Sequence, residues 1–326
     1  MDTQLYNAPL PAALEAERRS FLSARGLRGE TGADCVALVR DDSGRMAACG
    51  ALCGSVLREI AVRPDFEGEG ACAAIVSRLI AAAYEAQKTR LFLCTKPEHK
   101  RMFGSLGFFP LAETPDALLM ENSRDGLSRF LSSLEKPGGR AGAIVCNCNP
   151  FTRGHRYLIE QAALQCDALH VFVLSEEGAE FSAAERFQLA LAGTADIPNC
   201  LVHESAGYLV SRATFPAYFI KEAARADDVR ADLDLTLFGT RIAPALGITV
   251  RFVGTEPFCP VTRAYNARMK QLLPPMGVEV VEMARKDGIS ASRVREYMRE
   301  KNLPALRPLV PDTTYDCILR HLSRHA

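Results

Sequence analysis

The sequence predicts two domains, an α+β domain followed by an α/β domain with a parallel sheet. The chain has 326 residues, which is long for one domain and typical of two. Pro137, Gly138 and Gly139 form a linker signal between a helical pattern and an apolar run. Strand and helix patterns alternate strictly only after this point. We therefore expect domains at 1–137 and 141–326, joined by a linker at 138–140.

The first half groups its strands before one long helix, which is typical of an α+β fold. The expected strands are Cys35–Arg40, Met46–Cys53, Val56–Val62, Leu91–Cys94 and Phe108–Leu111. The expected helices are Ala71–Gln87, Met102–Leu106 and Leu127–Leu134.

The second half alternates, which predicts a parallel sheet with helices on both faces. The expected strands are Ala143–Cys146, Ala168–Leu174, Cys200–His203, Ile248–Val253 and Val278–Met283. The expected helices are His155–Gln165, Ala183–Ala192, Pro216–Ala226, Ala264–Leu273 and Ser292–Lys301. Ser182 and Glu185 form a capping-box signal for the second of these helices.

Composition excludes several classes of protein. Apolar residues make up 48% and charged residues 24%, which argues against a disordered chain. Basic and acidic residues balance at 39 each, so a general nucleic-acid binder is not expected. The apolar stretch Ala71–Ala83 is interrupted by Arg78 and is too short to span a membrane. The N-terminus lacks a signal-peptide pattern, so we expect a cytoplasmic protein without membrane partners.

Eleven cysteines, an odd number with no Cys-x-x-Cys pair, indicate reduced and mostly buried thiols. Cys146 and Cys148 are separated by one residue, and Cys49 and Cys53 by three. A metal site or a redox pair remains the alternative.

The first candidate site is Thr152-Arg153-Gly154-His155, between an expected strand and an expected helix. Ligands of parallel sheets bind beyond the carboxyl ends of the strands, and helix N-termini favour phosphate. Gly154 permits close backbone approach, while Thr152 and His155 can donate hydrogen bonds. The alternative is that Thr152 only caps the helix and His155 lies on the surface, with no ligand bound.

The second candidate is the segment from Gly288 to Arg295, which follows the last strand and opens a helix. Hydroxyls, guanidiniums and free helix amides converge there, so it predicts a second anion site. A capped helix with solvated arginines is the alternative.

Together the two segments resemble the nucleotidyltransferase superfamily, which carries a T/H-x-G-H motif early and an I-S-S-T-x-x-R motif late. Thr152 and His155 match the first motif. The second is matched by Ile289, Ser290, Ser292 and Arg295. The chain departs from the pattern at Ala291, where a hydroxyl is lost.

Segments 142–162, 211–221 and 251–266 are similar to the ligase family that acetylates citrate lyase. The resemblance implies an ATP- and Mg²⁺-dependent reaction. Acetate would become acetyl-adenylate and then pass to a prosthetic-group thiol on the citrate lyase acyl carrier subunit. It implies that His155, Thr152 and Arg295 are catalytic. The nucleotide-binding residues that it implies are Asn149, Pro150, Phe151, Gly154, Ser290 and Ser292. Arg263 is a further candidate, which either reaches a phosphate or is solvated.

Segments 58–80 and 101–111 resemble the GNAT acyltransferase fold, whose glycine-rich turn cradles the coenzyme A pyrophosphate. Gly70 matches that turn, and with Gly68 it is the candidate contact for a pantetheine arm. Glu67 and Glu69 would repel a pyrophosphate, so tight binding of free coenzyme A is not expected. The alternative is a scaffold kept for structure or protein docking.

Three further positions stay open. Cys259 between Phe258 and Pro260 favours buried packing over a nucleophile. Tyr265 and Asn266 suit either a nucleotide contact or a helix cap.

Two other functions remain possible on the sequence alone. One is an adenylyltransferase that makes a dinucleotide cofactor, similar to phosphopantetheine adenylyltransferase. The other is a regulatory module that binds the carrier protein. The acid preference, the oligomeric state and the group that deprotonates the acceptor thiol are left open.

Overall fold

The computed structural model describes residues 3–175, 179–209, 218–220, 223–257, 259–286 and 288–324. The chain divides into two compact units, Met1–Ser128 with Thr214–Leu233, and Arg129–Ala213 with Asp234–Ala326. These units differ from the predicted domains by residues 129–137 and by the segment 214–233. The segment belongs to the first unit because Tyr218, Phe219 and Ile220 are buried, and the Tyr218 hydroxyl donates to the Cys94 carbonyl at 3.4 Å.

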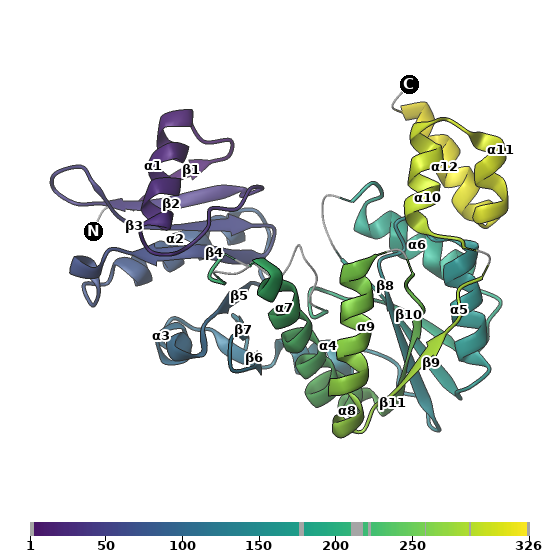
Figure 1. The fold of residues 1–326 in the computed structure, drawn as a ribbon. Helices are drawn as coiled ribbons and strands as arrows, with labels where there is room; N and C mark the ends of the chain where they lie inside the picture. Colours follow the sequence, from purple (N-terminus) through teal and green to yellow (C-terminus); the bar gives the residue numbers. More distant parts are fainter. Residues whose placement is uncertain are drawn as a thin grey trace. The chain divides into compact units, whose positions relative to one another are not determined.

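The first unit is built on a seven-stranded sheet in the order β1-β2-β3-β4-β5-β7-β6 (Figure 1). Neighbouring strands are antiparallel except β4 and β5, which are parallel. The strands are β1 (Thr3–Asn7), β2 (Cys35–Arg40), β3 (Met46–Cys53), β4 (Val56–Val62), β5 (Phe92–Thr95), β6 (Phe109–Glu113) and β7 (Leu118–Glu121). This is the predicted α+β architecture.

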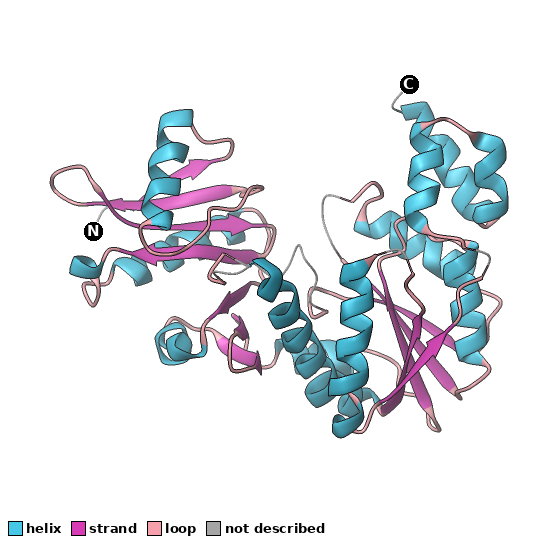
Figure 2. Ribbon diagram, in the orientation of Figure 1, coloured by secondary structure: helices cyan, strands magenta, loops and turns pink. Residues whose placement is uncertain are grey.

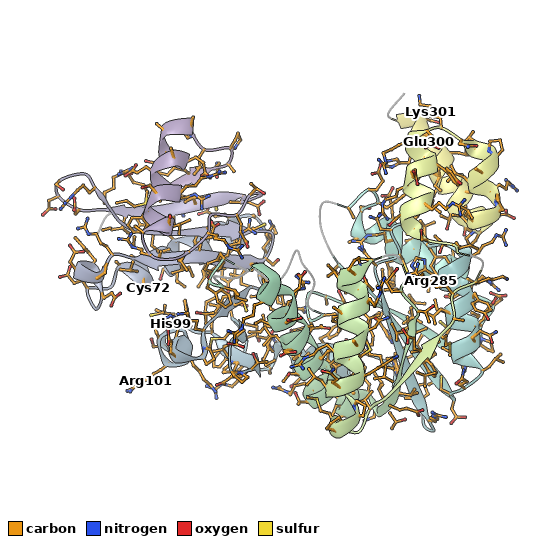
Figure 3. All side chains as sticks on the ribbon, viewed as in Figure 1. Cys72, His99, Arg101, Arg285, Glu300 and Lys301 are labelled. Carbon is orange, nitrogen blue, oxygen red and sulfur yellow. The ribbon has the colours of Figure 1, made fainter. Side chains whose placement is uncertain are left out.

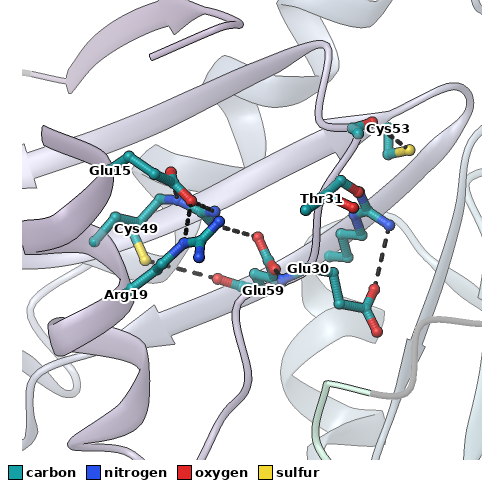
Figure 4. A network of polar contacts seen from close by, with 10 residues as sticks. Glu15, Arg19, Glu30, Thr31, Cys49, Cys53 and Glu59 are labelled. Carbon is teal, nitrogen blue, oxygen red and sulfur yellow. Dashed lines mark hydrogen bonds and ion pairs between the residues drawn. The ribbon is translucent and has the colours of Figure 1, made fainter. Parts of the chain in front are cut away.

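The first unit's helices are α1 (Ala12–Ser23), α2 (Ala71–Glu85), α3 (Lys100–Ser105) and the start of α4 (Gly126–Ser132), with short 3-10 turns at Pro64–Phe66 and Pro97–His99. Helix α2 lies close to β3, since a Cβ at Gly50 would stand 2.6 Å from Ile75 Cγ2. A buried ion pair between Arg18 and Glu59 joins α1 to β4; Glu59 and its surroundings are drawn in Figure 4.

The second unit contains five parallel strands in the order β10-β9-β8-β11-β12. Figure 2 draws the strands in magenta and the helices in cyan. They are β8 (Ala141–Cys146), β9 (Ala168–Val173), β10 (Cys200–Glu204), β11 (Ile248–Gly254) and β12 (Glu279–Met283). The strand order reverses between β8 and β11. This reversal is the point where open parallel sheets place their ligands.

Helices cover both faces of this sheet. They are α5 (Arg153–Ala163), α6 (Ala183–Gly193), the end of α7 (Ala223–Leu237), a π-helix (Phe238–Ile242), α8 (Ala243–Leu246), α9 (Pro260–Leu272), α10 (Ala291–Arg299), α11 (Leu303–Leu306) and α12 (Asp312–Arg324), with 3-10 turns at Pro274–Met276 and Arg307–Leu309. Ile159 of α5, Leu189 of α6 and Val294 of α10 share one core with the sheet. On the other face of the sheet, the Arg251 guanidinium stacks on the Phe238 ring and donates a hydrogen bond to the Tyr265 hydroxyl.

The predicted fold class is confirmed, because the described strands form an α+β unit and a parallel α/β unit. The Ser182–Glu185 capping box is present at α6. Part of the helix expected at Pro216–Ala226 lies outside the described residues. Within the described ranges, no helix combines the length and apolar character that a membrane crossing requires.

Candidate functional site

A cavity of about 660 Å³ opens at the carboxyl ends of β8 and β11, where the strand order reverses. The first turns of α5 and α10 both line it. The structure thus brings the two predicted motifs to one place. Its lining residues include Val145, Cys146, Asn147, Thr152, Gly154, His155, Tyr157, Phe252, Glu256, Cys259, Arg285, Lys286, Ile289, Ser290 and Ser292.

Thr152 and His155 lock the beginning of α5 through a reciprocal cap. The Thr152 Oγ1 accepts the His155 backbone N–H at 3.2 Å. In return the Thr152 backbone N–H donates to His155 Nδ1 at 3.1 Å. The cap is fully buried on the threonine side, and it fixes the orientation of the imidazole.

The same contact sets the protonation of His155. Nδ1 accepts a hydrogen bond from a backbone amide, so the proton of the neutral ring sits on Nε2. Burial, with the nearby charge of Arg285, lowers the pKa of His155 to about 4. His155 is therefore neutral at pH 7, and it is a hydrogen-bond donor on the cavity wall rather than a cation.

The N-terminus of α10 forms the facing wall. Ser290 caps the helix by accepting the Arg293 backbone N–H at 3.2 Å, and Ser292 follows at the second helical position. The first-turn amides that precede Arg293 have no intrahelical acceptor, so they are available to an anion. Gly154 allows this wall to approach α5, because a Cβ there would stand 3.2 Å from the Ile289 carbonyl oxygen.

Two cations that the sequence analysis missed, Arg285 and Lys286, also line the cavity. Arg285, labelled in Figure 3, donates to the Thr255 carbonyl at 2.7 Å and pairs with Glu256. Lys286 is exposed, with its Nζ 5.5 Å from the centre of the Tyr157 ring. The sequence feature that could have identified these two cations is their position directly after the last strand and before the second motif.

Three residues of the 147–152 loop, Asn149, Pro150 and Phe151, pack against the protein interior rather than line the cavity. The side chain of Phe151 is fully buried and packs against Gly193, where a Cβ would stand 2.3 Å from its ring. Asn149 Oδ1 accepts the Phe181 backbone N–H at 3.2 Å, and Pro150 is buried. None of the three is among the cavity-lining residues, so each shapes the loop.

Arg295 and Arg263 also bind protein groups. Arg295 Nη1 donates to the Asn149 carbonyl, and its Nη2 donates to Ser292 Oγ at 3.2 Å. It thereby ties α10 to the loop before α5. Arg263 donates to the carbonyls of Glu256 and Pro257 at 3.2 and 2.7 Å. Neither guanidinium is among the lining groups of the cavity.

The expectation that Cys259 packs in the interior was wrong. Cys259 is exposed and lines the cavity, because it stands before α9 rather than in a core. Hydrogen bonds from the Thr262 side chain and backbone lower the pKa of its thiol. Tyr265 and Asn266 lie within α9, where Tyr265 bonds Asp234 and Asn266 donates to the Gly254 carbonyl at 3.1 Å.

In the first unit, the turn containing Gly68 and Gly70 precedes α2. Both glycines have left-handed backbones, with φ of 84° and 83°, which a side chain would strain. Glu67 and Glu69 are exposed on the same turn. Two exposed carboxylates therefore flank the position predicted for a pantetheine arm.

The fold and the cavity define a two-unit protein whose second unit is an open parallel α/β domain with a ligand-sized cavity where its strand order reverses. The family model described as the citrate lyase ligase C-terminal domain matches residues 141–318. The chain is 48% identical over 301 residues to the [citrate [pro-3S]-lyase] ligase of Klebsiella pneumoniae, covering 88% of each chain. It is 43% identical over 326 residues to the enzyme of that name from Escherichia coli K12, covering 95% of this chain and 92% of that one.

The chain therefore belongs to the citrate lyase ligase family, and it is a ligase. A phosphopantetheine adenylyltransferase of Staphylococcus carnosus is 42% identical, but over 64 residues that make up only 19% of this chain. The alternative of a dinucleotide-forming adenylyltransferase is thus not favoured, since the ligases match along nearly the whole chain.

Proposed function

We propose that the cavity converts ATP and acetate into acetyl-adenylate and pyrophosphate. The acetyl group then passes to the prosthetic-group thiol of the citrate lyase acyl carrier subunit. One observation supports this proposal best. The N-termini of α5 and α10 and a neutral His155 all line one cavity, at the point where the strand order of the sheet reverses. Membership of the citrate lyase ligase family supports the choice of acid and acceptor.

The two helix N-termini are suited to hold the phosphates of ATP. Each presents first-turn amides and the positive end of a helix dipole to the cavity. The hydroxyls of Ser290 and Ser292 add donors from the α10 side. Lys286 is exposed and lines the cavity, so its charge can reach the polyphosphate.

His155 acts on the α-phosphate as a donor in this proposal. Acetate is already ionised at neutral pH, because carboxyl groups have a pKa of about 4, so its attack needs no general base. Negative charge grows on the phosphate oxygens during the displacement. A fixed Nε2–H that costs no reorganisation would stabilise that charge.

Mg²⁺ would enter with the nucleotide. Magnesium commonly binds through one or two carboxylates together with substrate phosphates. Among the described lining residues, Glu256 is the carboxylate, and it is paired with Arg285. No group of three metal-ligating side chains occurs in the described part of the chain. The phosphates would therefore supply most of the ligands, and Mg²⁺ would neutralise the leaving pyrophosphate.

Exchange of labelled pyrophosphate into ATP tests the first step. The full-length protein is assayed with formate, acetate, propionate and butyrate, and without acid. We expect exchange that depends on acetate and weakens with the longer acids. Exchange of equal rate without any acid would contradict adenylation of a carboxylate. Exchange with phosphopantetheine alone would instead support the adenylyltransferase alternative.

A further inference from the structure

Cys146 and Cys148 bring two thiols together at the end of β8. Their Sγ atoms are 3.1 Å apart. A disulfide needs about 2.05 Å, so the sulfurs must approach by about 1 Å. We propose that this pair is an oxidative modification site, at which a hydroperoxide converts the two thiols into a disulfide that a thiol reductant reopens.

The surrounding backbone is held in place for this bond. Cys148 has a left-handed φ of 52°, an unusual conformation for a residue other than glycine. The intervening Asn147 is fixed by the buried Arg186, whose Nη1 donates to the Asn147 carbonyl at 2.9 Å. The Leu174 backbone N–H donates to the Cys146 carbonyl at 3.0 Å. The sulfurs, rather than the chain, are therefore the atoms that move.

The two thiols differ in access, which sets the order of reaction. Cys146 is half-buried and lines the cavity, whereas Cys148 is fully buried. The hydrogen bond with Cys146, together with burial, raises the pKa of Cys148 well above its usual value. Cys146 meets the oxidant first, and Cys148 resolves the product.

The chemistry balances with a hydroperoxide as the oxidant. The Cys146 thiol loses its proton, its sulfur attacks the peroxide oxygen, and the O–O bond breaks to give a sulfenic acid and water or an alcohol. The Cys148 sulfur then attacks the Cys146 sulfur, and the hydroxyl group leaves with the Cys148 proton as water. Two electrons pass from the sulfurs to the peroxide.

The effect on activity rests on the proposed function. The bridge displaces the Cys146 sulfur from the cavity wall and constrains the loop that leads to Thr152. Small misplacements of catalytic groups cost large factors in rate, so we expect acetate-dependent exchange to fall about tenfold or more and to recover with dithiothreitol.

Peptide mapping tests the bond without an activity assay. The full-length protein is treated with hydrogen peroxide, its free thiols are alkylated, and it is cleaved with trypsin. The peptide 141–153 contains Cys146 and Cys148 and no other cysteine. We expect this peptide to be two hydrogens lighter and unalkylated, and to accept two alkyl groups after reduction. The Cys148→Ser variant should lose the bridge, while Cys166→Ser, at another half-buried thiol of the same unit, should keep it.

Two results would overturn the proposal. One is full alkylation of the 141–153 peptide after a treatment that oxidises the exposed Cys259. The other is conversion of Cys146 to a sulfinic or sulfonic acid without a bridge. A bridge that leaves exchange unchanged would refute the effect on activity. If the reduced protein shows no exchange at all, the proposed function fails while the mapping result stands.

Discussion

Gly154 of α5 lies against Ile289, the residue just before the cap of α10. A Cβ at Gly154 would stand 3.2 Å from the Ile289 carbonyl oxygen and 3.4 Å from Thr152 Oγ1. The 3.2 Å distance is tighter than ordinary packing, so a methyl group at residue 154 would require the Ile289 carbonyl to shift by a few tenths of an ångström. Glycine at residue 154 therefore allows the first turn of α5 to lie close to the residue before the α10 cap.

Gly154→Ala is expected to lower acetate-dependent exchange about tenfold and to cost about 1–2 kcal/mol of stability, the usual effect of overpacking. Gly104→Ala is the matched control, because a Cβ there meets nothing within 4 Å. Exchange rates and urea unfolding of both variants check this. An alanine at 154 with wild-type exchange would show that the walls need not touch.

His155→Ala is expected to lower adenylate formation by about 10²- to 10³-fold with little loss of fold, the scale for one charge-stabilising donor. Because the pKa of His155 is lowered to about 4, its ring does not titrate near neutrality. The wild-type rate should therefore show no His155 ionisation between about pH 5.5 and 8. Circular dichroism checks the fold. Activity within twofold of wild type would remove His155 from the reaction.

Arg295→Lys is expected to be damaging because an ammonium cannot serve the Asn149 carbonyl and Ser292 in the same geometry. Since the guanidinium holds the loop, we expect kcat to fall about tenfold while KM for ATP changes less. The sequence alone predicted a phosphate contact for Arg295. A rise in KM for ATP with unchanged kcat would support that contact instead.

Lys286→Ala is expected to raise KM for ATP about tenfold, as loss of a phosphate-binding charge does. Lys270→Ala serves as the control, because Lys270 pairs with Glu282 and is not among the cavity-lining residues. Steady-state kinetics with varied ATP decide the matter. Equal constants for the two variants would place Lys286 outside the nucleotide site.

Stability is expected to fall as the pH drops from about 6.5 to 4. Burial lowers the pKa values of His155, His170 and His203 to about 4 each. In this window the unfolded chain binds protons that the folded chain does not, which favours unfolding. His203→Gln removes one of these groups, so its stability should fall less than that of the wild type over the same window. If the wild type and the His203→Gln variant lose the same free energy of unfolding between pH 6.5 and 4, the lowered pKa assigned to His203 is contradicted.

Hydrophobic periodicity predicted the five strands of the second unit because these parallel strands are buried apolar runs. It missed the helices α8, α11 and α12 of that unit, and the helix expected at Pro216–Ala226 ends before most of α7. Three elements of the first unit were missed: β1, α1 and β7. β1 is a partly exposed edge strand, and α1 is largely polar with a buried Arg18, so neither has a strong apolar pattern. The place of Tyr218 in the first unit depends on contacts distant in sequence, which no local pattern reports.

The candidate site shows the same limit. The motif residues Thr152, His155 and Ser290 could be predicted because their spacing marks helix N-termini. Spacing does not tell whether an arginine reaches a ligand or a backbone carbonyl. Arg295 and Arg263 bind carbonyls, while Lys286 faces the cavity without belonging to either motif.

Transfer of oxygen from acetate tests the central claim most directly. Acetate labelled with ¹⁸O in its carboxylate is incubated with ATP, the protein and the thiol form of the carrier subunit, and the products are analysed by mass spectrometry. If the acid attacks the α-phosphate, one labelled oxygen remains on AMP when the thiol takes the acetyl group. We predict one ¹⁸O in AMP and none in pyrophosphate. Unlabelled AMP, with ¹⁸O in phosphate or pyrophosphate, would contradict an acetyl-adenylate.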